Sequence, residues 1–358
     1  MSVPTPEAAP EARSEGERRK LLWKRAIHIM LIVVPIGVLG NVVFTLLATD
    51  REVLAALTEF PRHYLFLALV LAFVPWLTHT LRLAIWTRFI GHGLTLRESF
   101  TVVVGTTLGG AASPTALGGG VFKWGLLMQR GVSPGAAASV TTLASVEDAI
   151  FFAIAIPTAI LVTGAWRMPL LRGIAEQIQA NLPAAVILVA VVVVLTWITL
   201  RILRLRRPAR KGGFGEEAPL RVRIWRRLRA AWWDARDVYE GIIRNGKGWF
   251  ALSMCLAAIQ WISRYSVIAA LAAFLGARVD VVLFFLLQWV VFSLMTMIPT
   301  PGATGGAEAS FFFVFGPLLP GEIIGIATAG WRFLTFYAQL TVGAVLFLFL
   351  YRRFRAGR

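Results

Sequence analysis

Long apolar runs set the strongest constraint on how this chain folds. Several of them reach about 20 residues without a charge, the length of helix that crosses roughly 30 Å of membrane hydrocarbon. Only 15% of the 358 residues are charged, whereas a soluble domain has about 25%. No segment alternates polar and apolar residues in the short strands of an outer-membrane barrel. The sequence therefore predicts an all-α, polytopic helical membrane protein of about six to eight transmembrane helices.

The predicted spans follow from the ends of these runs. The apolar runs are 26–48, 64–81, 101–122, 135–166, 184–200, 249–277, 281–307, 309–321 and 323–351. The first is too long for a signal-peptide core, so we expect it to remain as a transmembrane helix. We expect residues 101–130 to enter the membrane and return without crossing it.

The charge surplus of +17 predicts an orientation. Lys and Arg collect in the cytoplasmic loops of membrane proteins. Placing the N-terminus, 82–100, 123–130, 201–247 and the C-terminal tail inside puts 29 of the 36 basic residues there. We therefore expect a multi-pass protein of the inner membrane with both termini cytoplasmic, and the charge requires no nucleic acid as a partner.

The same pattern divides the chain into five parts. They are a disordered cytoplasmic N-terminus (1–20), a first membrane half (21–203), a basic cytoplasmic linker with an amphipathic helix (204–247), a second membrane half (248–351) and a basic tail (352–358). In the linker, apolar residues recur every three or four positions from Val222 to Ile242, with arginines largely off that stripe. Such a helix suits an anionic lipid surface, or its arginines only satisfy the orientation rule.

Two interruptions break the apolar sequence. The first is Gly109-Gly-Ala-Ala-Ser-Pro-Thr-Ala-Leu-Gly-Gly-Gly-Val-Phe-Lys123, and the second is Ile298-Pro-Thr-Pro-Gly-Ala-Thr-Gly-Gly-Ala-Glu308. A shift of 187 residues superposes Pro114 on Pro301 and Gly118 on Gly305. Proline and clustered glycine break helices, and broken backbone at membrane depth must be buried in protein or line a wet cavity. Paired re-entrant breaks in two related halves indicate a transporter-like site, although tight packing through small residues gives similar sequences.

Charged residues inside the apolar runs extend this prediction. Each is costly in the membrane and commonly functional. The candidate substrate-binding residues are Pro114, Gly118, Gly119, Gly120, Lys123, Pro301, Gly302, Gly305, Gly306, Glu308 and Arg332, with Glu147, Asp148 and Arg264 as possible intramembrane charge partners. Helix N-termini at the breaks would face an anion, with Lys123 and Arg332 as counter-charges. The alternative is that the charges only form structural ion pairs, such as Arg332 with Glu308 or Arg264 with Glu147.

The two broken segments resemble the transmembrane region of the lysylphosphatidylglycerol synthases, also called flippase-like domain proteins. The resemblance runs across most of residues 20–355, through Ala112 to Gly131, Ile298 to Glu308, and Gly330-Trp-Arg-Phe-Leu-Thr-Phe-Tyr337. The chain departs from the family pattern in having lysine at position 123, where arginine is usual, and no arginine in Ser145-Val-Glu-Asp148. The full synthases add a soluble aminoacyltransferase domain after the membrane part, and this sequence continues for seven residues after its last predicted span, so we do not expect it to synthesise an aminoacyl lipid.

The resemblance implies a membrane domain that moves or accommodates lipids. We expect membrane lipids, an anionic phospholipid or a lipid-linked substrate, as partners, and no cofactor or metal, because one cysteine and four scattered histidines form no ligand cluster. Two alternatives stay open. One is a membrane enzyme acting on a lipid-linked phosphate or sugar, although Glu147 and Asp148 would point about 100° apart on a helix. The other is a non-catalytic assembly partner.

Overall fold

The computed structural model describes residues 61–181 without 114–116, residues 183 and 194, and residues 220–356 without 299 and 304. Within these ranges the regular structure is helical, which confirms the predicted all-α class. The helices are α3 (Arg62–Phe89), α4 (Leu96–Ala112), α5 (Leu117–Gln129), α6 (Pro134–Thr163), α7 (Pro169–Ala180), α9 (Leu220–Asn245), α10 (Lys247–Phe274), α11 (Val281–Thr296), α12 (Gly306–Phe315), α13 (Gly321–Arg332) and α14 (Ala338–Ala356), with short 3₁₀ turns at Ala165–Arg167 and Pro301–Ala303 and a π-helical turn at Phe333–Tyr337.

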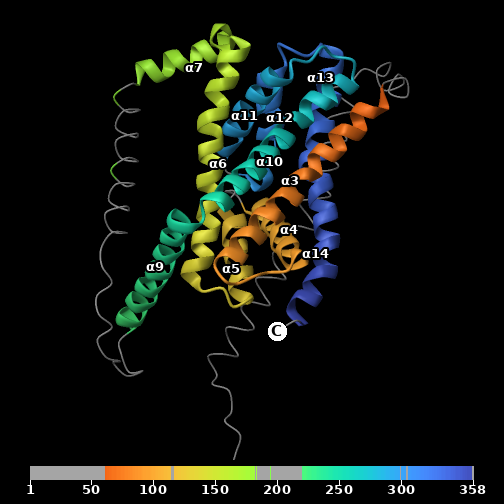
Figure 1. Ribbon diagram of the computed structural model, residues 1–358. Helices are drawn as coiled ribbons and strands as arrows, with labels where there is room; N and C mark the ends of the chain where they lie inside the picture. The colour runs from red at the N-terminus through yellow and green to blue at the C-terminus, as the bar shows by residue number, and fades with distance from the viewer. Residues whose placement is uncertain are drawn as a thin grey trace, which may run out of the picture.

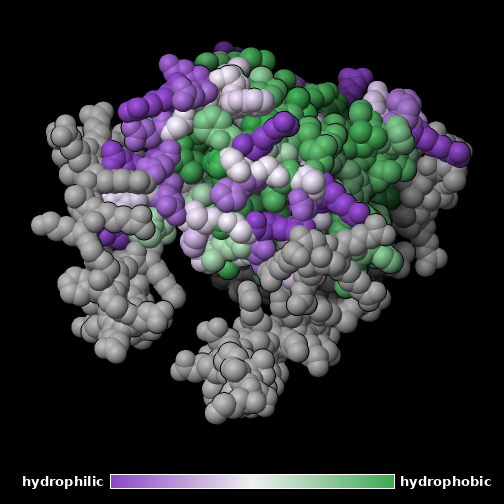
Figure 2. Space-filling model, turned by 60° about the horizontal axis from the view of Figure 1, so that its bottom comes forward, coloured by the Kyte–Doolittle hydropathy of each residue, from purple (hydrophilic) through white to green (hydrophobic). Residues whose placement is uncertain are grey.

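Four helical stretches are long and apolar enough to cross a membrane. They are α3, α6, α10 and the continuous stretch Gly321–Tyr351 that joins α13 to α14. Large apolar side chains such as Phe66, Leu161 and Phe349 are exposed on them, as lipid-facing helices require. In Figure 2 the molecule is turned so that the lower end of Figure 1 comes forward. Hydrophilic residues gather on that end, and hydrophobic residues cover the adjoining side of the molecule.

Two helical hairpins carry the breaks. α4 and α5 form the first hairpin and α11 and α12 the second, and their arms of 10 to 17 residues are short of the roughly 20 residues of a full span. In Figure 1 the α4–α5 hairpin occupies the lower half and the α11–α12 hairpin the upper half. Each hairpin thus enters from its own side and turns back, as expected for residues 101–130.

The two halves repeat one structural unit. Each has a long helix, a broken hairpin and a second long helix, and α3 and α10 are both 28 residues long. With a shift of 185 residues α3 superposes on α10, so that Leu71, Ala72, Trp76, Ala84 and Phe89 meet identical residues. The two helices pack against each other in opposite directions (Figure 1). The second half is therefore an inverted copy of the first, an arrangement found in many secondary transporters.

Local sequence signals fix where the helices begin. α4 has a capping box, in which Thr95 Oγ1 accepts from the Glu98 N–H (3.2 Å) and Glu98 accepts from the Thr95 N–H (2.9 Å). Asp280 caps α11 by accepting hydrogen bonds from the backbone N–H groups of Val282 and Leu283, at 2.9 and 3.0 Å. These caps satisfy donors that a helix start leaves unpaired, and they set the entry of each hairpin arm.

The structure corrects two assignments made from charge alone. Arg82 was counted in a cytoplasmic loop, but it lies inside α3 and is only 2% exposed. Lys123 was counted with the cytoplasmic residues 123–130, but it lies within α5 and is 4% exposed. The connections at 90–95 and 130–133 do lie together at the lower end of Figure 1. The predicted N-terminus 1–20, span 26–48, most of span 184–200 and linker 204–219 fall outside the described residues.

Candidate functional site

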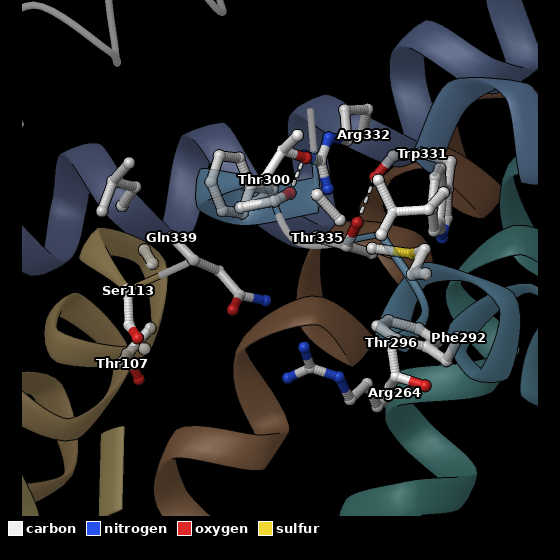
Figure 3. Close-up of a pocket in the computed structure, with 18 of the residues that line it drawn as sticks. Thr107, Ser113, Arg264, Phe292, Thr296, Thr300, Trp331, Arg332, Thr335 and Gln339 are labelled. Carbon is white, nitrogen blue, oxygen red and sulfur yellow. Dashed lines mark hydrogen bonds between the residues drawn. The ribbon is translucent and has the colours of Figure 1, made fainter. Parts of the chain in front are cut away.

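The tips of the two hairpins meet at a cavity of about 640 Å³, a size typical of ligand sites. One wall is the end of α4, and the opposite wall combines the end of α11, the second break, α13 and the π-helical turn (Figure 3). The lining residues are Thr106, Thr107, Gly110, Ala111, Ser113, Arg264, Phe292, Met295, Thr296, Ile298, Thr300, Gly302, Ala303, Trp331, Arg332, Thr335, Phe336, Gln339 and Leu340. The cavity therefore forms where the two inverted units touch.

Arg332 holds the second break in place. Its guanidinium donates a hydrogen bond to the Gly302 carbonyl, lies 3.2 Å (Nε to Oε1) from Glu308, and stands 4.2 Å over the Phe336 ring. Glu308 in turn accepts a hydrogen bond from the Gly305 N–H at 2.8 Å. Arg332 and Glu308 therefore form the ion pair that the sequence offered as one possibility, and the pair ties both ends of the break to α13.

The second break has a backbone that glycine makes possible. Gly302 and Ala303 have φ angles of +62° and +52°, and Gly305 has +81°, all in the left-handed region that side chains disfavour. A Cβ on Gly306 would overlap Ile298. These glycines thus set the shape of the turn, and Gly302 is the one that lines the cavity.

Arg264 is the second cation of the cavity. It projects from α10 into the space toward Gln339 (Figure 3), and its guanidinium carbon lies 5.2 Å from the centre of the Phe292 ring. Its buried Nε has no hydrogen-bond partner, and no carboxylate of the described residues forms a salt bridge with it. Glu308, just outside the lining, neutralises Arg332, so the two lining arginines and Glu308 together carry one net positive charge.

Four threonine hydroxyl groups around the cavity are already engaged with the backbone. Thr106, Thr107, Thr296 and Thr335 each donate to a carbonyl of their own helix, at 2.7 to 3.2 Å. Gln339 donates to the Ala72 carbonyl at 2.8 Å. The donors available to a ligand are therefore the two arginines and the Nε1 of Trp331, which has no partner among the described residues, and an anion is the ligand they suit.

A second buried cluster lies on α3, α6 and α10. Arg82 donates to Glu147 (3.1 and 2.7 Å), Gln260 (2.9 Å) and the Ala144 carbonyl (3.1 Å), and its Nη1 lies 2.9 Å from Asp148. The other oxygen of Glu147, a fully buried residue, accepts from Trp86 at 2.9 Å. Glu147 thus pairs with Arg82 and not with Arg264, and the two adjacent carboxylates meet one guanidinium despite pointing apart on their helix.

Sequence reasoning missed Arg82 because the predicted span ended at Leu81. The signal for it was present, since no helix breaker follows until Gly91 and Arg82 and Trp86 are four residues apart on one helix face. The glycines of the first break lie away from this cavity. Gly118 and Gly119 pack against α4 at Ser113 and Thr106, and neither they, Gly120 nor Lys123 line the cavity.

Comparisons with known proteins agree with this architecture. The family model described as the lysylphosphatidylglycerol synthase TM region matches residues 29–343. A UPF0104 membrane protein of Archaeoglobus fulgidus is 19% identical over 280 residues, which cover 75% of this chain and 81% of that protein. Because the family model spans most of the chain and the described helices are long and apolar, this multi-pass membrane protein belongs to the lysylphosphatidylglycerol synthase transmembrane-region family.

Proposed function

We propose that the protein binds the anionic headgroup of a membrane lipid in the cavity between its hairpin tips and passes that lipid across the membrane. The observation that carries the proposal is the pair of arginines, Arg264 and Arg332, in a cavity whose described lining residues include no carboxylate. A phosphate there would meet charge-assisted donors, which contribute about 1.5–3 kcal/mol each.

The charge balance favours a lipid with a single phosphate charge. Glu308 compensates Arg332, so Arg264 supplies the one uncompensated positive charge. Aromatic side chains at Phe292, Trp331 and Phe336 give the cavity an apolar surface beside these donors. An aminoacylated headgroup would add amines, for which the described lining residues supply no acidic partner. Phosphatidylglycerol itself therefore fits this cavity better than its lysyl ester.

Replacing Arg264 with glutamine tests this proposal. The variant keeps a hydrogen-bonding side chain but loses the uncompensated charge, so phosphatidylglycerol affinity should fall by about 1.5–3 kcal/mol, roughly ten- to a hundredfold in Kd. Native mass spectrometry with phosphatidylglycerol, its lysyl ester and phosphatidylcholine measures retention, and a fluorescent phosphatidylglycerol in reconstituted vesicles measures translocation. The matched control is Arg278→Gln, an exposed arginine just after α10. Equal retention and translocation in both variants would refute the assignment.

The distribution of Lys and Arg also supports a membrane orientation. We propose that the end with the connections 90–95 and 130–133 faces the cytoplasm, because most short-loop Lys and Arg belong to that side, and that the membrane is the inner one. In a Cys255→Ala background, a membrane-impermeant maleimide should label Glu322→Cys on intact cells. It should label His92→Cys only after lysis. Both positions are exposed, and the reverse labelling would invert the orientation.

A further inference from the structure

Lys123 and His79 bring two basic nitrogens together inside the first half. Lys123 on α5 is 4% exposed, and its Nζ lies 3.4 Å from Nε2 of His79 on α3. No carboxylate of the described residues forms a salt bridge with Lys123. The cavity does not include Lys123, so the binding of the lipid phosphate leaves this pair without a role.

A hydrogen bond between two basic nitrogens exists only when one carries a proton and the other offers a lone pair. The Lys123–His79 pair therefore cannot carry both positive charges in this contact: it is either neutral or holds one excess proton. A second proton would place two like charges side by side in a medium of low dielectric constant, which is costly. The pair thus has two accessible states, with and without that proton.

The charge of the Lys123–His79 pair changes the net charge of the neighbouring cluster. Arg82, Glu147 and Asp148 together carry one net negative charge, which a protonated Lys123 balances. Arg82 does not release its proton, and its donors are engaged by the two carboxylates and Gln260. Loss of the proton from Lys123 leaves the cluster with one uncompensated negative charge, which favours the protonated state of the pair.

Few other ionisable groups face this pair. α3 contributes His79 and Arg82, α6 contributes Glu147 and Asp148, and Arg264 on α10 is the nearest charge toward the cavity. The arm of α4 that packs on α5 has no ionisable residue between 99 and 112. The Asp148 side chain is 25% exposed, whereas Glu147 is fully buried. Asp148 is therefore the acidic side chain of the cluster that is partly accessible from outside it.

We propose that the Lys123–His79 pair is a proton-carrying site that couples proton movement to the cavity. Lys123 belongs to one arm of the α4–α5 hairpin, and the other arm supplies Thr106, Thr107 and Ser113 to the cavity wall. A change of charge at Lys123 would shift the position of the hairpin, and with it the part of the cavity wall that α4 supplies. The coupling of this proton to lipid movement rests on the proposed lipid translocation. The existence of the proton site does not depend on that proposal.

The decisive variant is Lys123→Arg, which keeps the positive charge but does not release its proton. The measurement is the transient current of proteoliposomes on a solid-supported membrane after a pH jump, with no lipid substrate added beyond the vesicle lipids. The wild-type protein gives a transient, Lys123→Arg loses it, and His79→Gln reduces it. Lys247→Arg, at an exposed lysine at the start of α10, retains it. Size-exclusion chromatography verifies that each variant is folded.

A wild-type protein without a transient, or a Lys123→Arg variant with an unchanged one, overturns the proposal. Native mass spectrometry of the same preparations separates it from lipid binding. Retained phosphatidylglycerol without a pH transient removes the proton site and leaves the lipid site. A transient without retained phosphatidylglycerol does the opposite.

Discussion

The Arg82→Ala variant should lose about 3–5 kcal/mol of unfolding free energy, because removing one partner of a buried ion pair leaves an uncompensated charge. Glu147 would remain fully buried and lose both of its arginine hydrogen bonds, and Asp148 would lose its cation. Chemical denaturation in detergent micelles, followed by tryptophan fluorescence, measures the change.

Two comparisons isolate the cause of that loss. Arg88→Ala removes an exposed arginine from the same helix and should change the stability little. Arg82→Met combined with Glu147→Met replaces the pair by apolar side chains and should recover much of the stability, since such replacements are often neutral. If the Arg82→Ala and Arg88→Ala variants unfolded at the same denaturant concentration, the cluster around Arg82 would not contribute to stability.

The sequence predicted the all-α membrane fold well because span length and Pro/Gly breaks act locally. A run such as 249–277 can satisfy its backbone in the membrane only as a helix, and α10 (Lys247–Phe274) is that helix. Pro301 and Gly302 likewise interrupt the second half where the structure places a 3₁₀ turn. Pro114, the matching residue of the first break, lies outside the described residues.

The charge partners could not be predicted because they join segments distant in sequence. Arg82 and Glu147 are 65 residues apart, and Arg82 and Gln260 are 178 apart. Their meeting depends on how α3, α6 and α10 cross, which no local pattern encodes. Arg332 and Glu308 were easier to pair, because only the rest of α12, one short connection and α13 separate them.

The internal repeat was detected from its breaks, but its register depends on the helices. The shift of 187 residues aligned Pro114 with Pro301 across loops of different length. α3 and α10 instead align at 185, which places His79 opposite Arg264. A helix position is fixed by packing, whereas a loop tolerates insertions. The two halves thus carry different side chains at this position, a histidine in one and an arginine in the other.

Gly302→Ala should destabilise the protein by about 2–5 kcal/mol, from the left-handed backbone (about 1–2) and from overpacking (about 1–3). A Cβ on Gly302, at φ +62°, would overlap the Phe336 ring. Phe336 lies under the Arg332 guanidinium, which also binds the Gly302 carbonyl. The methyl group would therefore push the ring against the cation of the cavity, so lipid retention should fall along with stability.

The chain provides a control that separates these two causes. Gly276, which ends α10, has φ +78° but nothing within 4 Å of an added Cβ. Gly276→Ala should therefore cost only the backbone strain of about 1–2 kcal/mol and leave lipid retention unchanged. Adding Phe336→Leu to Gly302→Ala should recover part of the packing loss but not the strain. If Gly302→Ala behaved like Gly276→Ala in both stability and retention, the second break would not hold the shape of the cavity.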